Sequence, residues 1–138
     1  MPVPAPLIAA YEAAHYVVFG EPEIVMKVGE KNAQIDALLA AQGADRAAFV
    51  SAANPRGLRR RLVENVVAFH TLRNVLRKSR YLVYEGEGRD PKGAWRPEGS
   101  ILVLDIPRED AEALGQRFGQ NAILYVERGE PPELVLLR

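Results

Sequence analysis

Apolar residues recur along this chain with two different spacings, which predict helices in some segments and strands in others. Apolar positions three and four apart predict a helix that begins at Leu7, and the β-branched end of this segment, near Val18, is either its last part or already a strand. Three more helices are expected: a short one capped by Asn32, a long one over Leu58–Lys78, and one from Pro107 to Arg117. Short apolar runs predict strands at residues 24–28, 47–52, 81–85, 100–106, 122–127 and 133–137.

These elements predict a single domain of the α+β class. We expect residues 1–138 to form a mixed β-sheet of five to six strands packed against three to four helices. Two pairs of strands are adjacent in sequence and favour antiparallel contacts, with one or two crossover connections elsewhere. A length of 138 residues is near the commonest domain size and allows a core without disulfides or metals.

The long predicted helix carries polar residues within its apolar stripe. Asn65 and Arg73 project into this stripe, where a polar group without a partner costs a few kcal/mol. In one interpretation Asn65 ties down a loop and Arg73 pairs with a carboxylate or reaches the rim of the core; in the other, both point into a cleft at the sheet edge. The stripe itself should face the sheet and consists of Leu58, Leu62, Val66, Phe69, Leu72 and Leu76.

The turn before that helix, SAANPRG from Ser51 to Gly57, joins a strand end to a basic helix start. Strand-to-helix turns at the carboxyl end of a sheet are common ligand sites, and helix N-termini favour anions. Asn54 is the candidate ligand-binding residue of this turn. With one glycine and no Gly-Lys-Ser/Thr, the turn is neither a P-loop nor a dinucleotide fingerprint, and a solvated Asn-Pro turn explains it equally well.

The connection from Gly86 to Ser100 is long for a compact domain and is therefore a candidate binding loop. It contains the only tryptophan, Trp95, which either anchors the loop to the body of the protein or stacks on a ring of a ligand. Glu98 is the candidate catalytic acid or base of this segment, although spacing alone does not show that any two of its carboxylates converge.

Two primary amides follow the last predicted helix. In the stretch RFGQN, Gly119 is a natural C-terminal cap and accounts for the turn. Asn121 can hydrogen-bond the backbone of this turn, which leaves Gln120 unexplained. Amides at the start of a strand can also read the donors and acceptors of a base or a carbohydrate, so Gln120 and Asn121 are both candidate ligand-binding residues.

Composition excludes several kinds of site. The chain has no cysteine, and its two histidines, His15 and His70, stand far apart in sequence, so a thiolate site, a histidine metal site or a catalytic triad is not indicated. We therefore expect no metal and no cofactor. No apolar run reaches the roughly 18 residues of a membrane span, and the start MPVPAP lacks the features of a signal peptide, so the cytoplasm is the expected compartment.

Charge is balanced overall but not locally. The net charge is zero, yet residues 56–80 carry eight basic residues and one acidic residue, a local charge of +7 that leaves −7 on the remainder. Such asymmetry produces a local positive field. The field is compatible with nucleic-acid binding, whose affinity would fall steeply with added salt, or with an acidic protein partner, including another copy of the chain.

Taken in chain order, the motifs FVSAANPRG, GEGRDPKGAWRPEGS and LGQRFGQNAI, with a closing PPELVLLR, resemble a family of short bacterial proteins classed as a domain of unknown function. The resemblance extends over nearly the whole chain and implies no established activity and no assigned catalytic residues. Many members of that family have a polar or small run where this chain has Arg59–Arg61. The resemblance therefore favours the following candidates over the basic patch: Asn54, Asn65, Trp95, Glu98, Gln120 and Asn121.

The expected function is binding of, or a simple reaction on, a polar molecule such as a phosphorylated or nucleotide-like one. The four amides would orient this molecule, Arg73 would supply charge, and Glu98 would act as acid or base. Two alternatives are nucleic-acid binding through the basic surface of residues 56–80 and a structural role with a protein partner. Neither the residues nor the resemblance decides among the three.

Overall fold

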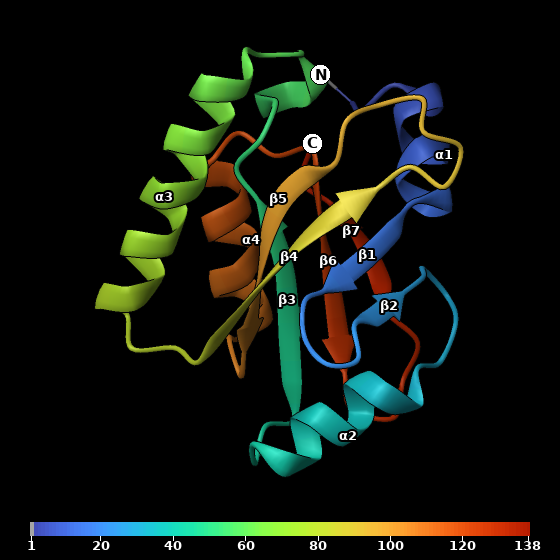
Figure 1. Cartoon of the computed structure of the whole chain (residues 1–138), viewed down its shortest axis with the longest axis vertical. Helices are drawn as coiled ribbons and strands as arrows, with labels where there is room; N and C mark the ends of the chain where they lie inside the picture. The colour runs from blue at the N-terminus through green and yellow to red at the C-terminus, as the bar shows by residue number, and fades with distance from the viewer. Residues whose placement is uncertain (1) are drawn as a thin grey trace.

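The computed structural model describes residues 2–138 (Figure 1). Its helices are α1 (Ala5–Ala13), α2 (Ala33–Ala41), α3 (Leu62–Lys78) and α4 (Arg108–Arg117), with a short 3-10 helix η1 (Pro55–Gly57). Its strands are β1 (His15–Val18), β2 (Ile24–Met26), β3 (Arg46–Ser51), β4 (Val83–Arg89), β5 (Glu98–Leu104), β6 (Ala122–Glu127) and β7 (Glu133–Leu136).

All seven strands belong to one sheet, in the order β2-β1-β4-β5-β3-β6-β7. Every neighbouring pair is antiparallel. The four central strands and the two longest helices follow one another as β3-α3-β4-β5-α4-β6, and each of these helices connects strands that have one other strand between them. This is the split β-α-β arrangement of ferredoxin-like domains, which β1, β2 and β7 widen at its edges.

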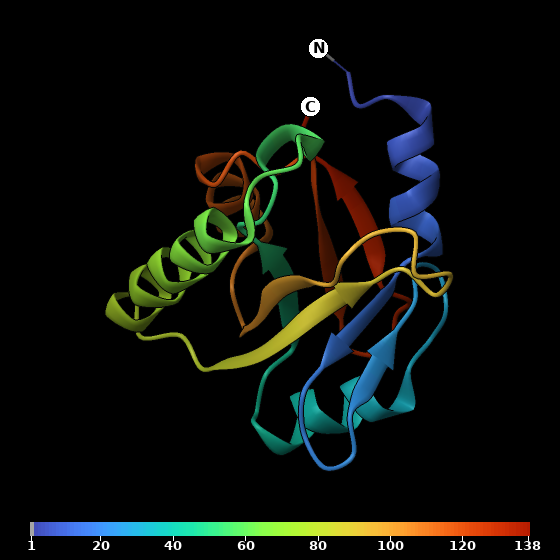
Figure 2. The ribbon, with the colours of Figure 1, turned by 45° about the horizontal axis from the view of Figure 1, so that its top comes forward.

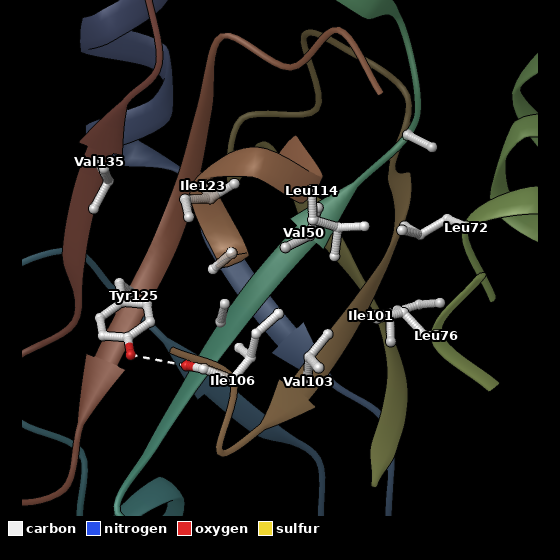
Figure 3. Packing of buried hydrophobic residues seen from close by; sticks show 13 residues of the cluster. Val50, Leu72, Leu76, Ile101, Val103, Ile106, Leu114, Ile123, Tyr125 and Val135 are labelled. Carbon is white, nitrogen blue, oxygen red and sulfur yellow. Dashed lines mark hydrogen bonds between the residues drawn. The ribbon is translucent and has the colours of Figure 1, made fainter. Parts of the chain in front are cut away.

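Helices α3 and α4 cover one face of the sheet. Leu72 and Leu76 of α3 and Leu114 of α4 pack against the side chains that β3, β5 and β6 direct to this face, as Figure 3 shows. Fully burying a leucine side chain such as that of Leu76 stabilises the fold by about 1.5–3 kcal/mol. The Tyr125 hydroxyl in this core donates a hydrogen bond of 2.9 Å to the Ile106 carbonyl, so its polar end is satisfied.

The opposite face of the sheet curls around a second core (Figure 2). Phe49, Leu102 and Leu124 point to this side, where they pack with Ile35 and Leu39 of α2. The two edges of the curled sheet approach one another at this end, because the amide of Gly29, after β2, donates a hydrogen bond of 2.9 Å to the carbonyl of Pro132, before β7. Helix α1, at the other end of the curl, buries none of its residues completely.

Several local predictions are confirmed by the backbone. The Asn32 side chain caps α2 by accepting a hydrogen bond of 2.9 Å from the Ile35 amide. Gly43 and Gly119 both have positive φ just after a helix, as predicted for C-terminal cap residues. The closing hairpin of β6 and β7 is also present.

The predicted sheet was wrong in two respects. It has seven strands rather than five to six, and it is antiparallel rather than mixed. The additional strand, β1, lies at the β-branched end of the first predicted helix, a stretch whose sequence is compatible with either helix or strand. The connections through α3 and α4 each join two strands that run parallel to one another, β3 with β4 and β5 with β6. One antiparallel strand lies between the members of each pair, so no parallel strands are neighbours.

The apolar stripe predicted for the long helix meets the sheet only along its second half. Leu72 and Leu76 are buried, whereas Leu58, Leu62 and Val66 are exposed, and α3 begins at Leu62 rather than at Leu58. A polar contact between Asn65 and the turn after β3, rather than core packing, fixes the first turns of α3. The periodicity identified residues that share a face but not whether that face is covered.

Both ends of the predicted connection from Gly86 to Ser100 are strand. β4 continues through Arg89 and β5 starts at Glu98, which leaves residues 90–97 as the loop. Glycine at position 86 allows β1 and β4 to pair closely, because a Cβ added there would lie 2.0 Å from the Val17 carbonyl oxygen. Residues 86–89 of this strand read GEGR and contain no β-branched or aromatic residue, which is why the sequence predicted a loop.

Candidate functional site

A cavity of about 280 Å³ lies between α1 and the curled face of the sheet, at the end that α2 does not fill. Its walls are mostly apolar, with Leu7 and Ala10 from α1 and Phe49 and Leu124 from the strands. Polar side chains from the turns and strand ends enter the same space. Small, largely apolar hollows with a few converging polar groups are the usual form of a small-molecule site.

Five of the seven candidate residues line this cavity: Asn54, Trp95, Glu98, Gln120 and Asn121. They come from the turn after β3, the β4–β5 loop, the start of β5 and the residues before β6. Asn65 lies behind Asn54 and lines a neighbouring groove on the α3 side. Arg73 lines neither hollow and forms an ion pair of 3.3 Å with Glu85, which agrees with the simpler of its two interpretations.

Asn54 organises the turn that leads from β3 towards α3. Its backbone is left-handed (φ 45°, ψ 61°), a conformation that asparagine tolerates better than most residues. Its backbone N–H donates to Asn65 Oδ1 (3.0 Å). Its side-chain Oδ1 accepts from Asn65 Nδ2 (3.0 Å) and from the backbone N–H of Arg60 (2.9 Å). The remaining group, Nδ2, donates to Glu98 Oε2 at 2.5 Å, so Asn54 positions that carboxylate.

Glu98, the candidate acid or base, is the first residue of β5 and its side chain is half-buried. Burial raises the pKa of this carboxyl, while the hydrogen bond from Asn54 opposes the shift. Raised carboxyl pKa values in a hollow are typical of groups that exchange protons near neutral pH, although structural carboxylates also show them. Glu98 also lines both the cavity and the groove, and so forms part of the wall between them.

Gln120 and Asn121 have different environments. Gln120 Nε2 donates to the carbonyls of Ala53 (3.0 Å) and Phe118 (3.2 Å) and thereby links two turns. Asn121 is buried, and its Nδ2 donates to the Tyr11 hydroxyl at 2.9 Å while its Oδ1 accepts from the Arg138 guanidinium. Asn121 therefore bonds side chains from both ends of the chain rather than only the backbone of its own turn.

Trp95 is half-buried and lies in a loop whose turn is held by hydrogen bonds to Asp90. The Asp90 carboxylate accepts from the amides of Lys92 (3.0 Å) and Ala94 (2.8 Å), which folds residues 90–94 into a turn. Trp95 follows this turn and lines both the cavity and the groove. Glu87 pairs with Arg89 at 2.6 Å, so Asp90 and Glu87 both have structural partners and Glu98 is the loop-region carboxylate that faces the cavity.

Several residues that line the cavity were not among the candidates. Tyr16 projects from β1, and its hydroxyl donates to the Tyr11 carbonyl at 2.6 Å. Burial raises the pKa of the Tyr16 phenol, with further contributions from Tyr11 and Glu98. The spacing of Leu7, Ala10 and Tyr11 predicted a helix, but it gave no sign that this helix faces a hollow rather than the core.

Residues 2–138 contain neither a cluster of metal ligands nor a helix that could span a membrane. No group of three or more histidine, aspartate or glutamate side chains is arranged to hold a metal ion there. Likewise, no helix in this range has both the length and the apolar character needed to cross a bilayer.

Comparison with family models matches residues 50–123 to a family described as a protein of unknown function (DUF3293). The chain belongs to this family. The matched segment runs from the end of β3 to the start of β6, so it contains all seven candidate residues and excludes α1, β1, β2, α2 and β7. No curated protein and no solved structure matches the chain.

Proposed function

We propose that the cavity under α1 binds a small molecule that has an apolar ring and N–H donors along one edge. The single observation behind this proposal is the meeting of five polar or aromatic side chains from separate segments in one hollow, one of which, Glu98, is a half-buried carboxyl with a raised pKa. Nitrogen heterocycles such as nucleobases are the chemical class that combines an apolar ring with N–H donors along one edge.

Unused acceptors support the choice of an N–H donor. Glu98 accepts from Asn54 through Oε2, and in the described part of the chain its Oε1 has no hydrogen-bond partner. Gln120 uses only its Nε2 for the two carbonyls, which leaves its Oε1 without a donor from residues 2–138. Two unpaired acceptors on residues that line the same hollow favour a ligand with two donors, because an unpaired polar group costs about 1–3 kcal/mol when a ligand covers it.

The size and walls of the cavity support a small, flat, apolar body. Pockets for drug-sized ligands occupy about 300–1,000 Å³, so a cavity of about 280 Å³ suits a single ring system. Tyr16, Phe49 and Trp95 offer aromatic surfaces, and stacking on an aromatic side chain contributes about 1–3 kcal/mol per base.

Glu98 is the group that we propose exchanges a proton with the ligand. In its neutral form the carboxyl can donate to a ring nitrogen, and in its ionised form it accepts from an N–H group. Asn54 remains bonded to the other oxygen in both states, so the carboxyl keeps its position while its charge changes.

Thermal-shift measurements with matched ligands test this proposal. The panel contains adenine, cytosine, their nucleosides and monophosphates, and N,N-dimethyladenine, which keeps the ring but lacks the exocyclic donors. A ligand at about 100 times its Kd stabilises the folded state by about 2.7 kcal/mol, which raises the melting temperature measurably. Glu98→Gln removes the proton exchange and should weaken binding about tenfold or more.

Two further variants test whether the ligand occupies the cavity and whether loss of an unrelated carboxylate affects binding. Gly88 lines the cavity, and a Cβ added there would have no neighbouring atom within 4 Å. Gly88→Val should therefore block binding without disturbing the strand. Glu30→Gln changes an exposed glutamate and should bind as the wild type does. The proposal fails if no ring compound stabilises the wild type, or if Gly88→Val and Glu98→Gln bind the best ligand unchanged.

A further inference from the structure

The first two turns of α3 expose a continuous set of aliphatic side chains. Leu62, Val63, Val66 and Val67, with Leu58 just before the helix, are between 46% and 69% exposed. Figures 1 and 2 show α3 at the periphery of the molecule. A helix that carries apolar residues around most of its surface is normally covered, and contiguous exposed apolar patches mark interaction sites.

An open groove of about 840 Å³ runs along this part of α3, on the side that faces the β4–β5 loop. Leu62, Val66 and Phe69 line it from the helix, at positions i, i+4 and i+7. Phe19 and Pro97 line it from the other side. The groove is distinct from the cavity under α1, with Asn54, Trp95 and Glu98 among the residues in the wall that separates them.

The rim of the groove is basic. Arg59, Arg60, Arg61 and Arg96 line it, and of these only Arg61 has a carboxylate within 4 Å among residues 2–138, namely that of Glu64 at 3.4 Å. The groove's two carboxylates are already engaged, since Glu87 pairs with Arg89 and Glu98 accepts from Asn54. An occupant must therefore offer apolar side chains to the floor and negative charge to the rim.

The charges on α3 argue against a two-fold contact with a second copy. A symmetric contact places the same surface on both sides. Residues 56–80 carry eight basic residues and one acidic residue, so such a contact would bring like charges together. Nucleic acid would satisfy the arginines, but it offers phosphates and sugars rather than an apolar surface to Leu62, Val63 and Val66.

We propose that this groove and the exposed flank of α3 form a docking site for an acidic, amphipathic segment of another protein. Helices that lie in apolar grooves present anchors at i, i+3 or i+4, and i+7, a spacing that Leu62, Val66 and Phe69 can match. Acidic residues beside those anchors would pair with Arg59, Arg60 and Arg96 and would speed association. This inference does not depend on a ligand in the cavity.

A random peptide library displayed on phage tests the proposal without assuming a sequence. Peptides of about 16 residues, long enough for roughly four helical turns, are selected on the whole chain. The doubly substituted variant Leu62→Ser/Val66→Ser serves for counter-selection. We expect enrichment of sequences with Leu, Ile or Phe at helical spacing and Asp or Glu between them.

Affinities of the enriched peptides are then measured with charge and apolar variants. Leu62→Ser/Val66→Ser and Arg60→Gln/Arg96→Gln should each weaken binding about tenfold or more. Leu136→Ser, at an exposed apolar position on β7, and Arg77→Gln, near the C-terminal end of α3, are the matched controls and should bind normally. Circular dichroism checks that each variant is folded, as expected for substitutions at exposed positions.

Three results would overturn the proposal. The first is a selection that enriches nothing over the variant, or that enriches basic rather than acidic peptides. The second is binding of a single- or double-stranded oligonucleotide that the apolar variant leaves unchanged and that displaces the peptides. The third is concentration-dependent self-association in sedimentation that Leu62→Ser/Val66→Ser abolishes, which would assign the surface to another copy of this chain.

Discussion

Glu98 is subject to two opposing influences on its pKa. Burial, the larger influence, disfavours the charged form, whereas the hydrogen bond from Asn54 Nδ2 favours it. The net result is a raised pKa, so the folded protein holds this proton to a higher pH than the unfolded chain does. Stability that depends on Glu98 is therefore fully present below the unfolded pKa, near 4.5, and declines as the pH rises through the folded value.

Glu98→Gln should remove this pH dependence. A glutamine oxygen can still accept from Asn54, but it carries no charge at any pH. We expect the free energy of unfolding of Glu98→Gln to increase relative to that of the wild type as the pH rises from about 4 to about 8. Urea unfolding at several pH values measures the difference.

The exposed Glu30→Gln variant supplies the control for the loss of one surface carboxylate. A difference between Glu98→Gln and the wild type that stays constant over this pH range would contradict the assigned effect of burial. A decrease would mean that the Asn54 hydrogen bond outweighs burial.

At the scale of elements, the contact between Asn65 and Asn54 fixes the start of α3. Asn65 Oδ1 accepts from the backbone N–H of Asn54, and Asn65 Nδ2 donates to Asn54 Oδ1, both at 3.0 Å. These two hydrogen bonds join the helix to the turn after β3. Because aliphatic residues around Asn65 are exposed, this polar contact holds the helix end that the core does not. The same contact positions the Asn54 side chain for Glu98.

Asn65→Ala should therefore destabilise the protein and weaken ligand binding together. The variant leaves the Asn54 amide and Oδ1 with fewer partners, which costs about 1–3 kcal/mol. Urea unfolding measures this loss. Asn74→Ala, at an exposed position of the same helix, should change the free energy of unfolding by no more than about 0.5 kcal/mol. Equal effects of the two substitutions would show that the contact contributes no stability.

The elements differ in how far their sequences predicted them. α2 and its cap were predictable because Asn32 and Gly43 act locally, within one or two turns of the chain. The second half of β4 was not, because Gly86 and Gly88 take strand geometry only through pairing with β1 and β5. Of the seven candidates, five meet in the cavity, since polar residues at turns gather at strand ends.

The whole molecule consists of a ferredoxin-like centre with additional elements at its edges. The family match covers the part of the centre from the end of β3 to the start of β6, whereas α1 and β1, which complete the cavity, lie outside the matched segment. No local pattern could reveal this cavity, because its walls come from residues as distant as Leu7 and Leu134. The hollow results from the curl of the whole sheet and not from any one motif.

Asn121 joins these peripheral elements to the centre. It is buried before β6, bonds Tyr11 of α1 and Arg138 at the other end of the chain, and accepts from the Leu137 amide through its own carbonyl (2.8 Å). Helix α1 buries no residue completely, and the Tyr16 hydroxyl supplies a second hydrogen bond to it, at the Tyr11 carbonyl. We expect loss of the Asn121 side chain to weaken the attachment of α1.

Asn121→Ala should loosen α1 more than the rest of the fold. Loss of one hydrogen bond to a buried group corresponds to about 1–3 kcal/mol. Hydrogen exchange of the α1 amides should accelerate about tenfold, equivalent to about 1.4 kcal/mol, while the amides around Leu72 and Leu76 in α3 change less. Tyr11→Phe removes only the bond to α1 and should reproduce this effect without altering the Arg138 contact. Uniform acceleration in α1 and α3 would instead mean that Asn121 supports global stability, and unchanged exchange in α1 would mean that apolar packing alone holds the helix.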